Sequence, residues 1–214
     1  EEYFQEVDAG LDFKKIDADI VRRWMVHLMD EGRAATSVNR KLSTLRSFYR
    51  FLLRRKEVVI NPMLKVVGPK KKKPLPFFVR EKDMDRLLDE SLFEEGFEGC
   101  RDRLILEMFY ATGMRLSELI GLNDADVDLS ARLIKVTGKR NKQRLIPFGN
   151  EMEEDLLIYI KVRNEALPEG TKAFFVRKNG MRMYPLQVYR LVRKSLSKVV
   201  TLKKRSPHVL RHTF

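Results

Sequence analysis

Residues 111–122 read ATGMRLSELIGL, and this stretch joins two helical patterns through a short turn. The apolar run at residues 104–109 predicts a strongly hydrophobic helix before it. Gly113 favours the end of that helix, and Arg115 would then start the next one. At a helix start, free N–H groups and the helix dipole also favour an anion. The stretch therefore predicts a place for a negatively charged group between two helices.

The sequence after this stretch changes from a helical to a strand pattern. Residues 133–136 (LIKV) and 144–147 (RLIP) read as two short strands. The turn-rich residues 137–143 would join them as a hairpin with Lys139 at its tip, able to reach into a groove. Residues 128–130 are a candidate first strand. We therefore expect one small antiparallel sheet.

Helical patterns fill most of the remaining chain. In the second half they occupy about 81–92, 150–164 and 185–200. Near the start, Asp17 would cap one helix that ends at Gly32, and Thr36 or Ser37 would cap the next. Residues 173–176 fit either type of structure. The whole pattern predicts a mainly α fold with a small antiparallel β-sheet, which is an α+β architecture.

The segment GPKKKKPLP at residues 68–76 separates two parts of the chain. Its prolines favour extended backbone and its lysines repel one another, so it reads as a linker. The predicted organisation is a small helical domain at 1–67, a basic linker at 68–78 and a larger domain at 79–214. A basic linker can also lie along a phosphate backbone.

The charge of the chain points to a polyanionic partner. The formal net charge is +13 and the sequence pI is about 9.9. Residues 33–73 carry thirteen Lys and Arg against a single acid, Glu57. A solvated helix normally mixes both signs, so the neutralising charge is expected outside the protein, with nucleic acid as the first candidate. The alternative is a merely solubilising surface.

Several other classes of protein are disfavoured by the sequence. The lone Cys100 cannot form an internal disulfide or a cysteine-based zinc site, which fits a reducing compartment. The three histidines, His27, His208 and His212, have no carboxylate cluster at ligand spacing. No P-loop and no long apolar run are present. We expect no metal, no cofactor and no membrane span.

Chemistry on a phosphodiester without a metal needs arginine, lysine and histidine. Arginine forks stabilise the equatorial oxygens of the transition state, and Lys or His can protonate the leaving oxygen. Besides Arg115 and Lys139, the segment SPHVLRHTF at 206–214 sets His208 and Arg211 on one helical face. Each of these features alone is common: a surface arginine, a solvated lysine or a chance His-x-x-Arg.

Taken together and in this order, the segments resemble those of the tyrosine recombinases, especially the Xer and phage-integrase branch. ATGMRLSELIGL is similar to the first Arg motif of that family, VTGKRNKQRLIP to its Lys hairpin, and SPHVLRHTF to its His-x-x-Arg motif. Residues 36–52 (TSVNRKLSTLRSFYRFL) resemble the last helices of the SAM-like core-binding domain. The resemblance implies site-specific breakage and rejoining of DNA through a 3′-phosphotyrosine.

The resemblance also implies a role for each residue of the motifs. Arg115 and Arg211 would hold the non-bridging oxygens of the scissile phosphate. Lys139 would act as general acid for the leaving 5′-hydroxyl, and His208 would assist proton transfer at the nucleophile. Glu118 would orient the first Arg motif. A homotetramer on DNA is expected for the full-length protein, acting in the cytoplasm at the bacterial nucleoid.

The sequence departs from the family pattern at its ends. Relatives carry the nucleophilic Tyr after the His-x-x-Arg motif, whereas the tyrosines of this chain all precede His208. We therefore expect the nucleophile beyond Phe214, and a natural protein that is longer at both ends. The 214-residue polypeptide should then bind DNA weakly and cleave none.

A wider set of residues is predicted to touch DNA. It comprises Thr36, Ser37, Arg40, Lys41, Arg46 and Arg50 in the small domain, Lys70 and Lys71 in the linker, Lys142 and Arg144 in the hairpin, and Gln187, Arg190 and Lys194 in the helix after Pro185.

Two other functions stay open at this point. One is a non-catalytic DNA-binding accessory protein on the same scaffold. The other is a basic helical structural protein, which gives no reason for Arg115, Lys139, His208 and Arg211 to converge. The sequence does not separate chromosome dimer resolution, prophage integration and mobile-element transposition, and it does not reveal the target site.

Overall fold

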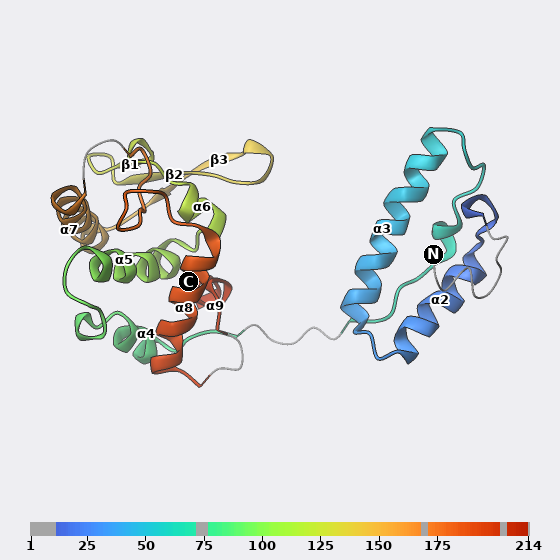
Figure 1. The fold of residues 1–214 in the computed structure, drawn as a ribbon, viewed down its shortest axis with the longest axis horizontal. Helices are drawn as coiled ribbons and strands as arrows, with labels where there is room; N and C mark the ends of the chain where they lie inside the picture. The colour runs from blue at the N-terminus through green and yellow to red at the C-terminus, as the bar shows by residue number, and fades with distance from the viewer. Residues whose placement is uncertain (1–11, 72–76, 168–170, 202–204, 214) are drawn as a thin grey trace. The chain divides into compact units, whose positions relative to one another are not determined.

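The fold is mainly α-helical with one small antiparallel sheet, as predicted. The computed structural model describes residues 12–71, 77–167, 171–201 and 205–213 (Figure 1). The chain divides into two compact units, Glu1–Pro74 and Leu75–Phe214, each with its own hydrophobic core. The division falls inside the predicted basic linker, of which residues 72–76 lie outside the described ranges. None of the described helices has the length and apolar character to cross a membrane.

In the part of the smaller unit that the structure describes, there are two α-helices and two short 3-10 turns. They are η1 (Phe13–Lys15), α2 (Ala18–Asp30), α3 (Ala35–Arg54) and η2 (Pro62–Lys65). The apolar stripes of α2 and α3 meet in a core with Val21, Val38, Leu42 and Tyr49, all 1 % exposed or less. These residues recur at helical spacing, so that each helix buries one face and leaves the other to solvent.

Of the two helix starts predicted in this unit, one is confirmed and the other is wrong. Asp17 caps α2, because its side chain accepts a hydrogen bond of 2.8 Å from the N–H of Ile20. The expected cap of α3 at Thr36 or Ser37 is wrong: the helix begins earlier, and its N-cap is Ala34. Ala34 is extended, and its carbonyl accepts the N–H of Ser37. The next residue is also alanine, the best helix former, so Thr36 and Ser37 fall within the first turn.

Both helices of the smaller unit end in the same hydrogen-bonded motif. After α2, Gly32 has φ +76°, and the N–H groups of Gly32 and Arg33 donate to the carbonyls of Met29 and Leu28. After α3, Lys56 has φ +60° and makes the corresponding bond to Leu53. This is the Schellman arrangement, in which a left-handed residue follows the helix. The predicted helix end at Gly32 is confirmed.

The larger unit contains most of the helices and the sheet. Its elements are α4 (Glu81–Leu87), η3 (Glu90–Leu92), α5 (Phe97–Thr112), α6 (Leu116–Gly121), η4 (Asp124–Asp126), β1 (Val127–Asp128), β2 (Leu133–Thr137), η5 (Lys139–Asn141), β3 (Gln143–Pro147), α7 (Asn150–Ala166), α8 (Pro185–Val199) and α9 (Pro207–Thr213). The strands pair antiparallel in the order β1-β2-β3, so the predicted hairpin is confirmed. In Figure 1 the sheet lies on one side of α5 and α4 on the other.

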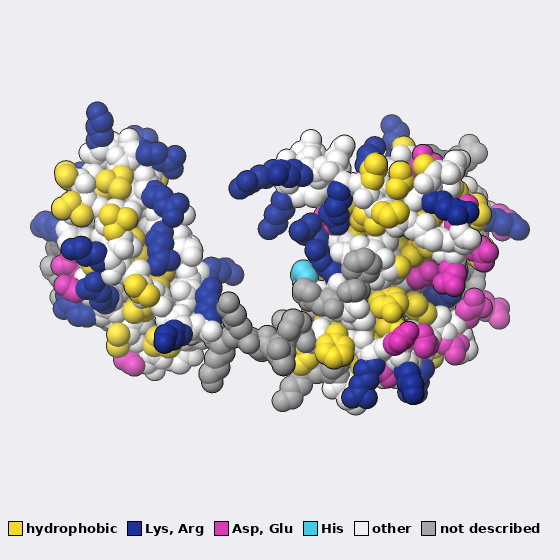
Figure 2. Space-filling model, turned by 180° about the vertical axis from the view of Figure 1, so that it is seen from behind, with side chains coloured by type: hydrophobic (Ala, Val, Ile, Leu, Met, Phe, Trp, Pro, Cys, Tyr) yellow, Lys and Arg dark blue, Asp and Glu magenta, His cyan; other side chains and the backbone are white. Residues whose placement is uncertain are grey.

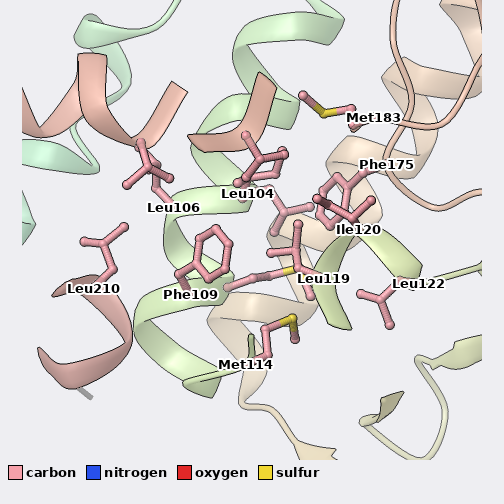
Figure 3. Packing of buried hydrophobic residues seen from close by; sticks show 14 of the residues in the cluster. Leu104, Leu106, Phe109, Met114, Leu119, Ile120, Leu122, Phe175, Met183 and Leu210 are labelled. Atoms are coloured by element: carbon pink, nitrogen blue, oxygen red, sulfur yellow. The ribbon is translucent and has the colours of Figure 1, made fainter. Parts of the chain in front are cut away.

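Helix α5 is the centre of the larger unit. Leu104, Ile105, Leu106, Met108 and Phe109 are at most 1 % exposed, so this helix is apolar around most of its circumference. It packs against α7, α8 and α9. Figure 3 shows its side chains meeting those of the α6 region and of α9. A buried central helix of this kind fixes the position of whatever follows its last turn.

Residues 173–176, which fitted either type of structure, form isolated β-bridges instead of a strand. Ala173 pairs with Asn123, and Val176 pairs with Arg182. All four residues of the segment are buried, and the hydroxyl of Tyr159 donates to the carbonyl of Phe174 at 2.8 Å. The apolar composition therefore reflects burial in the core and no regular element.

Candidate active site

The turn between α5 and α6 brings Arg115 to the surface. Gly113 takes the left-handed conformation at φ 56°, and its N–H donates to the carbonyl of Phe109. Met114 is then fully buried, which anchors the turn in the core. Arg115 follows as the N-cap of α6, and 45 % of its side chain is exposed. A buried anchor beside an exposed arginine is a rigid way to present a guanidinium to a ligand.

A buried carboxylate holds this arginine. One Glu118 oxygen accepts the backbone N–H of Arg115 at 2.7 Å, and the other accepts its guanidinium at 2.7 Å. The N–H that the sequence suggested as free for an anion is therefore occupied by Glu118. The predicted orienting role of Glu118 has this contact as its physical basis.

A second arginine reaches the same carboxylate from the hairpin. Arg144 on β3 donates to both oxygens of Glu118, at 2.8 and 2.9 Å. Burial alone raises the pKa of Glu118, but the hydrogen bonds from Arg144 and Arg115 outweigh it and bring the pKa to about 2. Glu118 is therefore an anion under any physiological condition, which excludes it as a general acid.

The β2–β3 hairpin places Lys139 at the start of the turn η5. Lys139 is exposed, and the turn behind it closes with a hydrogen bond of 2.8 Å from the N–H of Gly138 to the carbonyl of Lys142. Arg140 and Asn141 are both left-handed, with φ 60° and 56°. In Figure 1 the hairpin extends past α6. Lys139 thus sits directly after the residue that lies against Glu118.

His208 and Arg211 lie three residues apart on α9, which packs against α5 and α8. His208 is exposed and Arg211 is half-buried. Thr213 near the end of this helix accepts the backbone N–H of Val79 at 3.0 Å. Helix α5 therefore packs against α9 and also leads into the turn that carries Arg115. The convergence of His208 and Arg211 with Arg115 and Lys139 on one phosphate stays a prediction.

The far end of α6 is fastened by an arginine that the sequence did not single out. Arg182 donates to the carbonyls of Ile120 and Leu122, the latter at 2.8 Å. With Glu118 at one end and Arg182 at the other, this six-residue helix is held at both termini. The i, i+3 spacing of Arg115 and Glu118 was visible in the sequence. The partners of Arg144 and Arg182 were not, because they depend on long-range packing.

The predicted DNA contacts of the smaller unit are mostly exposed. Thr36, Ser37, Arg40, Lys41, Arg50, Lys70 and Lys71 are exposed, whereas Arg46 is half-buried and donates to the carbonyl of Val66 at 2.9 Å. Of the cations in the described range 33–71, only Arg33 forms an ion pair with an acid, Glu31. Figure 2 shows this unit covered by Lys and Arg with few acidic side chains. These residues form an outward positive surface.

The predicted DNA contacts of the larger unit have more varied surroundings. Lys142 is exposed, but Arg144 is engaged with Glu118, and the Gln187 side chain accepts the N–H of Tyr184 at 3.3 Å. Arg190 and Lys194 line a groove of about 340 Å³ that also contains Glu94, Glu98 and Asp102. Figure 2 shows Lys and Arg gathered at the edge where the hairpin extends, and acids at the opposite edge. The roles of these residues in DNA binding stay predictions.

Comparison with known proteins shows to which protein family the chain belongs. Residues 78–214 match the model of the phage integrase family, and residues 1–56 match the N-terminal SAM-like domain of phage integrases. The chain belongs to the phage integrase family, and the recognised resemblance to Xer-like tyrosine recombinases is confirmed.

The relatives are named as recombinases of the Xer branch. The chain is 39 % identical to tyrosine recombinase XerC of Chlorobaculum tepidum, with 98 % of this chain and 68 % of the relative covered. It is 38 % identical to XerC of Thermodesulfovibrio yellowstonii, with 100 % and 72 % covered. It is 35 % identical to XerD of Staphylococcus epidermidis, with 96 % and 70 % covered.

Solved structures show the same fold at lower identity. The Tn1549 transposon integrase in complex with circular intermediate DNA has a TM-score of 0.73 and 21 % identity, over 99 % of this chain and 76 % of that one. XerH site-specific recombinase bound to palindromic difH substrate has a TM-score of 0.78 and 20 % identity, over 99 % and 64 %.

Proposed function

We propose that this chain carries the phosphate-binding and DNA-binding parts of a site-specific recombinase that breaks and rejoins DNA through a 3′-phosphotyrosine. The observation that carries the proposal is the arrangement around Glu118, which fixes Arg115 at the surface beside the hairpin of Lys139. Membership of the family and the DNA complexes of XerH and the Tn1549 integrase support it. We expect double-stranded DNA as the partner.

The chemistry follows from the groups that the larger unit presents. Arg115 and Arg211 bind the non-bridging oxygens of the scissile phosphate and neutralise the charge that grows on them in the transition state. A tyrosine oxygen attacks phosphorus, with His208 assisting the transfer of its proton. The bond to the 5′-oxygen breaks, and Lys139 gives that oxygen a proton. Rejoining reverses these steps, so the phosphodiester bond energy is kept in the phosphotyrosine.

The tyrosines of the two cores and of α8 are poor candidates for the nucleophile. Burial raises the pKa of Tyr49 to about 12 and also raises the pKa of Tyr159, which are inner residues of the two cores. Tyr184 and Tyr189 are exposed but lie around the start of α8, before His208 in the chain. The proposal expects the nucleophile in the sequence that follows Phe214, and no cleavage by the 214 residues alone.

The first test uses the complete recombinase and a nicked duplex that carries the recombination site mapped in the source genome. Arg115→Ala or Arg211→Ala should lower the yield of covalent protein–DNA adduct by roughly 10²-fold or more, because each removes a donor to the transition state. Binding of the intact duplex should persist. Adduct formation at the original rate by either variant removes that residue from the site.

The second candidate function is a non-catalytic DNA-binding protein on the same scaffold. The expected absence of the nucleophile from these 214 residues is what favours it. The coding sequence after Phe214 separates the two: a Gly-His followed by a Tyr favours the enzyme, and a stop codon favours the binding protein. A covalent adduct formed by the 214 residues themselves would contradict both expectations.

The assembly and the setting of the reaction are also part of the proposal. Relatives in this family lead us to expect a homotetramer on two duplexes, acting on DNA in the bacterial cytoplasm. The 214-residue polypeptide is expected to bind DNA weakly. Chromosome dimer resolution, prophage integration and mobile-element transposition would all use the site in the same way.

A further inference from the structure

One side chain, Arg144, fastens the hairpin of Lys139 to the turn of Arg115. Arg144 lies on β3 opposite Val136 of β2, so it belongs to the same hairpin as Lys139. Its two terminal nitrogens donate to the two oxygens of Glu118 at 2.8 and 2.9 Å. A planar guanidinium paired in this bidentate way sets orientation as well as distance.

Glu118 can serve as the anchor because its carboxylate is buried and hydrogen-bonded on both oxygens. Its side chain is 0 % exposed, and its oxygens accept four hydrogen bonds, two from Arg115 and two from Arg144. Four donors occupy the acceptor positions of a carboxylate, so the buried charge is fully compensated. Arg115 of the turn and Arg144 of the hairpin are therefore held by the same carboxylate.

The hairpin backbone lies directly against this anchor. A Cβ atom added at Gly138 would lie 3.1 Å from an oxygen of Glu118 and 3.6 Å from the carbonyl of Lys142. The backbone of Gly138 has φ −99°, which any residue adopts, so the need for glycine comes from this close approach. Lys139 is the next residue, and its backbone position depends on the same contact.

We propose that Arg144 is a positioning residue, which couples the placement of the general acid Lys139 to that of the phosphate-binding Arg115 through Glu118. This inference rests on the proposed function, because it adds a residue to the same site. Without Arg144, Glu118 keeps both bonds to Arg115, but the hairpin loses its hydrogen-bonded link to the anchor. The resulting defect lies in the transfer of a proton from Lys139 to the leaving 5′-oxygen.

The test compares two nicked duplexes, cleaved by the complete recombinase, that differ in one atom. In one the bridging 5′ atom is oxygen, and in the other it is sulfur, which leaves as a thiolate without a proton. Arg144→Ala should slow cleavage of the oxygen substrate by roughly 10- to 100-fold, the effect of a misplaced group. The sulfur substrate should recover most of that loss, because it does not need Lys139.

Arg132→Ala is the matched control. Arg132 pairs with Glu153 at 2.7 Å and its side chain is 49 % exposed, against 41 % for Arg144, but its partner lies on α7 and not on α6. It should cleave both substrates at the rate of the unaltered protein. Equal rates for Arg144→Ala and Arg132→Ala on the oxygen substrate overturn the proposal. A loss for Arg144→Ala that is the same on both substrates also overturns it.

Two more variants keep the test sharp if Arg144→Ala does not fold. Arg144→Lys keeps a charge but loses the bidentate fork, so its defect should be smaller and still recovered by sulfur. Gly138→Ala leaves Arg144 in place but pushes the hairpin from Glu118, and it should show the same recovery. A Gly138→Ala protein with full activity on the oxygen substrate contradicts the coupling.

A measurement on the 214-residue chain is independent of catalysis. The N–H of Gly138 donates to the carbonyl of Lys142, so its hydrogen exchange reports the closure of the hairpin turn. Arg144→Ala should exchange this amide faster than Arg132→Ala does, and equal exchange would contradict the link. If the complete protein cleaves neither substrate, the proposed function fails, while the exchange result still tests whether Arg144 fastens the hairpin.

Discussion

The two units differ in how often their arginines pair with acids. In the larger unit, Arg101, Arg103, Arg144 and Arg163 each form an ion pair with an acid of the same unit. In the smaller unit, the described cations of residues 33–71 are exposed except for the half-buried Arg46, and Arg33 alone among them pairs with an acid. An excess of arginine in a sequence therefore has two interpretations. The arginines either form ion pairs within the protein or remain unpaired at a positive surface. Only the placement of the acids in space separates them.

The largest expected effect on stability comes from removing a buried arginine that forms an ion pair within the larger unit. Arg163 is 6 % exposed, and it donates to both oxygens of Asp124 and to the carbonyl of Phe174. Arg163→Ala removes the guanidinium that binds the half-exposed Asp124 carboxylate and one of the two donors to the Phe174 carbonyl, so it should lower the free energy of unfolding by about 2–3 kcal/mol. Urea denaturation followed by circular dichroism measures this. The matched change Arg50→Ala in the smaller unit should stay within about 0.5 kcal/mol. Equal losses would erase the difference between the units.

A buried acid of the larger unit, Glu107, is expected to make the stability of that unit depend on pH. Burial, and then a hydrogen bond and repulsion from Asp155, raise the pKa of Glu107 to about 8. Between about pH 4.5 and about pH 8, Glu107 is protonated in the folded protein and ionised in the unfolded chain. The free energy of unfolding therefore falls as the pH rises through this range. Glu107→Gln should melt higher than the unaltered protein at pH 8.5, and the difference should shrink toward pH 5. A difference that does not change with pH would contradict a protonated Glu107.

The smaller unit is expected to respond to salt through its DNA binding. Arg40 and Lys41 are exposed and have no acidic partner among the described residues. The double variant Arg40→Ala, Lys41→Ala should reduce the slope of log binding constant against log salt by about 0.9 for each lost phosphate contact. Lys14→Ala is the control, because Lys14 pairs with Glu57 at 3.3 Å. Binding of a duplex by the 214-residue chain across a salt series measures both, and an unchanged slope would place the DNA elsewhere.

The smallest expected effect concerns the two helix ends of the smaller unit. Gly32 and Lys56 occupy the same left-handed position after α2 and α3, but only glycine adopts it without cost. Lys56→Gly should therefore stabilise the protein by about 1 kcal/mol, and Gly32→Lys should destabilise it by a similar amount. Thermal unfolding of both variants tests this, and shifts of equal sign would contradict it.

The sequence predicted the elements better than their partners. The apolar run of α5, the hairpin and the helix end at Gly32 follow from local periodicity and turn chemistry, and all were found. The start of α3 was misplaced because a polar residue near a helix start resembles a cap even when the backbone enters the helix earlier. Arg115 was recognisable as a site residue from its motif and its turn.

What escaped prediction was the second layer of contacts around the site. Arg144 was predicted as a DNA contact, yet its terminal nitrogens donate to Glu118, 26 positions away in the chain. Arg46 was assigned to the DNA face, yet it donates to a carbonyl 20 positions away. Such partners depend on how distant segments pack, and a single sequence carries no local signal for them.

The position of Trp24 has a practical consequence. It is the only tryptophan of the chain, and it lies on α2, packed against the core of the smaller unit. Its fluorescence therefore reports the state of that unit alone, whereas the aromatic group of Phe97, Tyr159, Phe174 and Phe175 belongs to the other. Emission from a single native fluorophore can thus follow the loosening of one part of the molecule while the other is held folded.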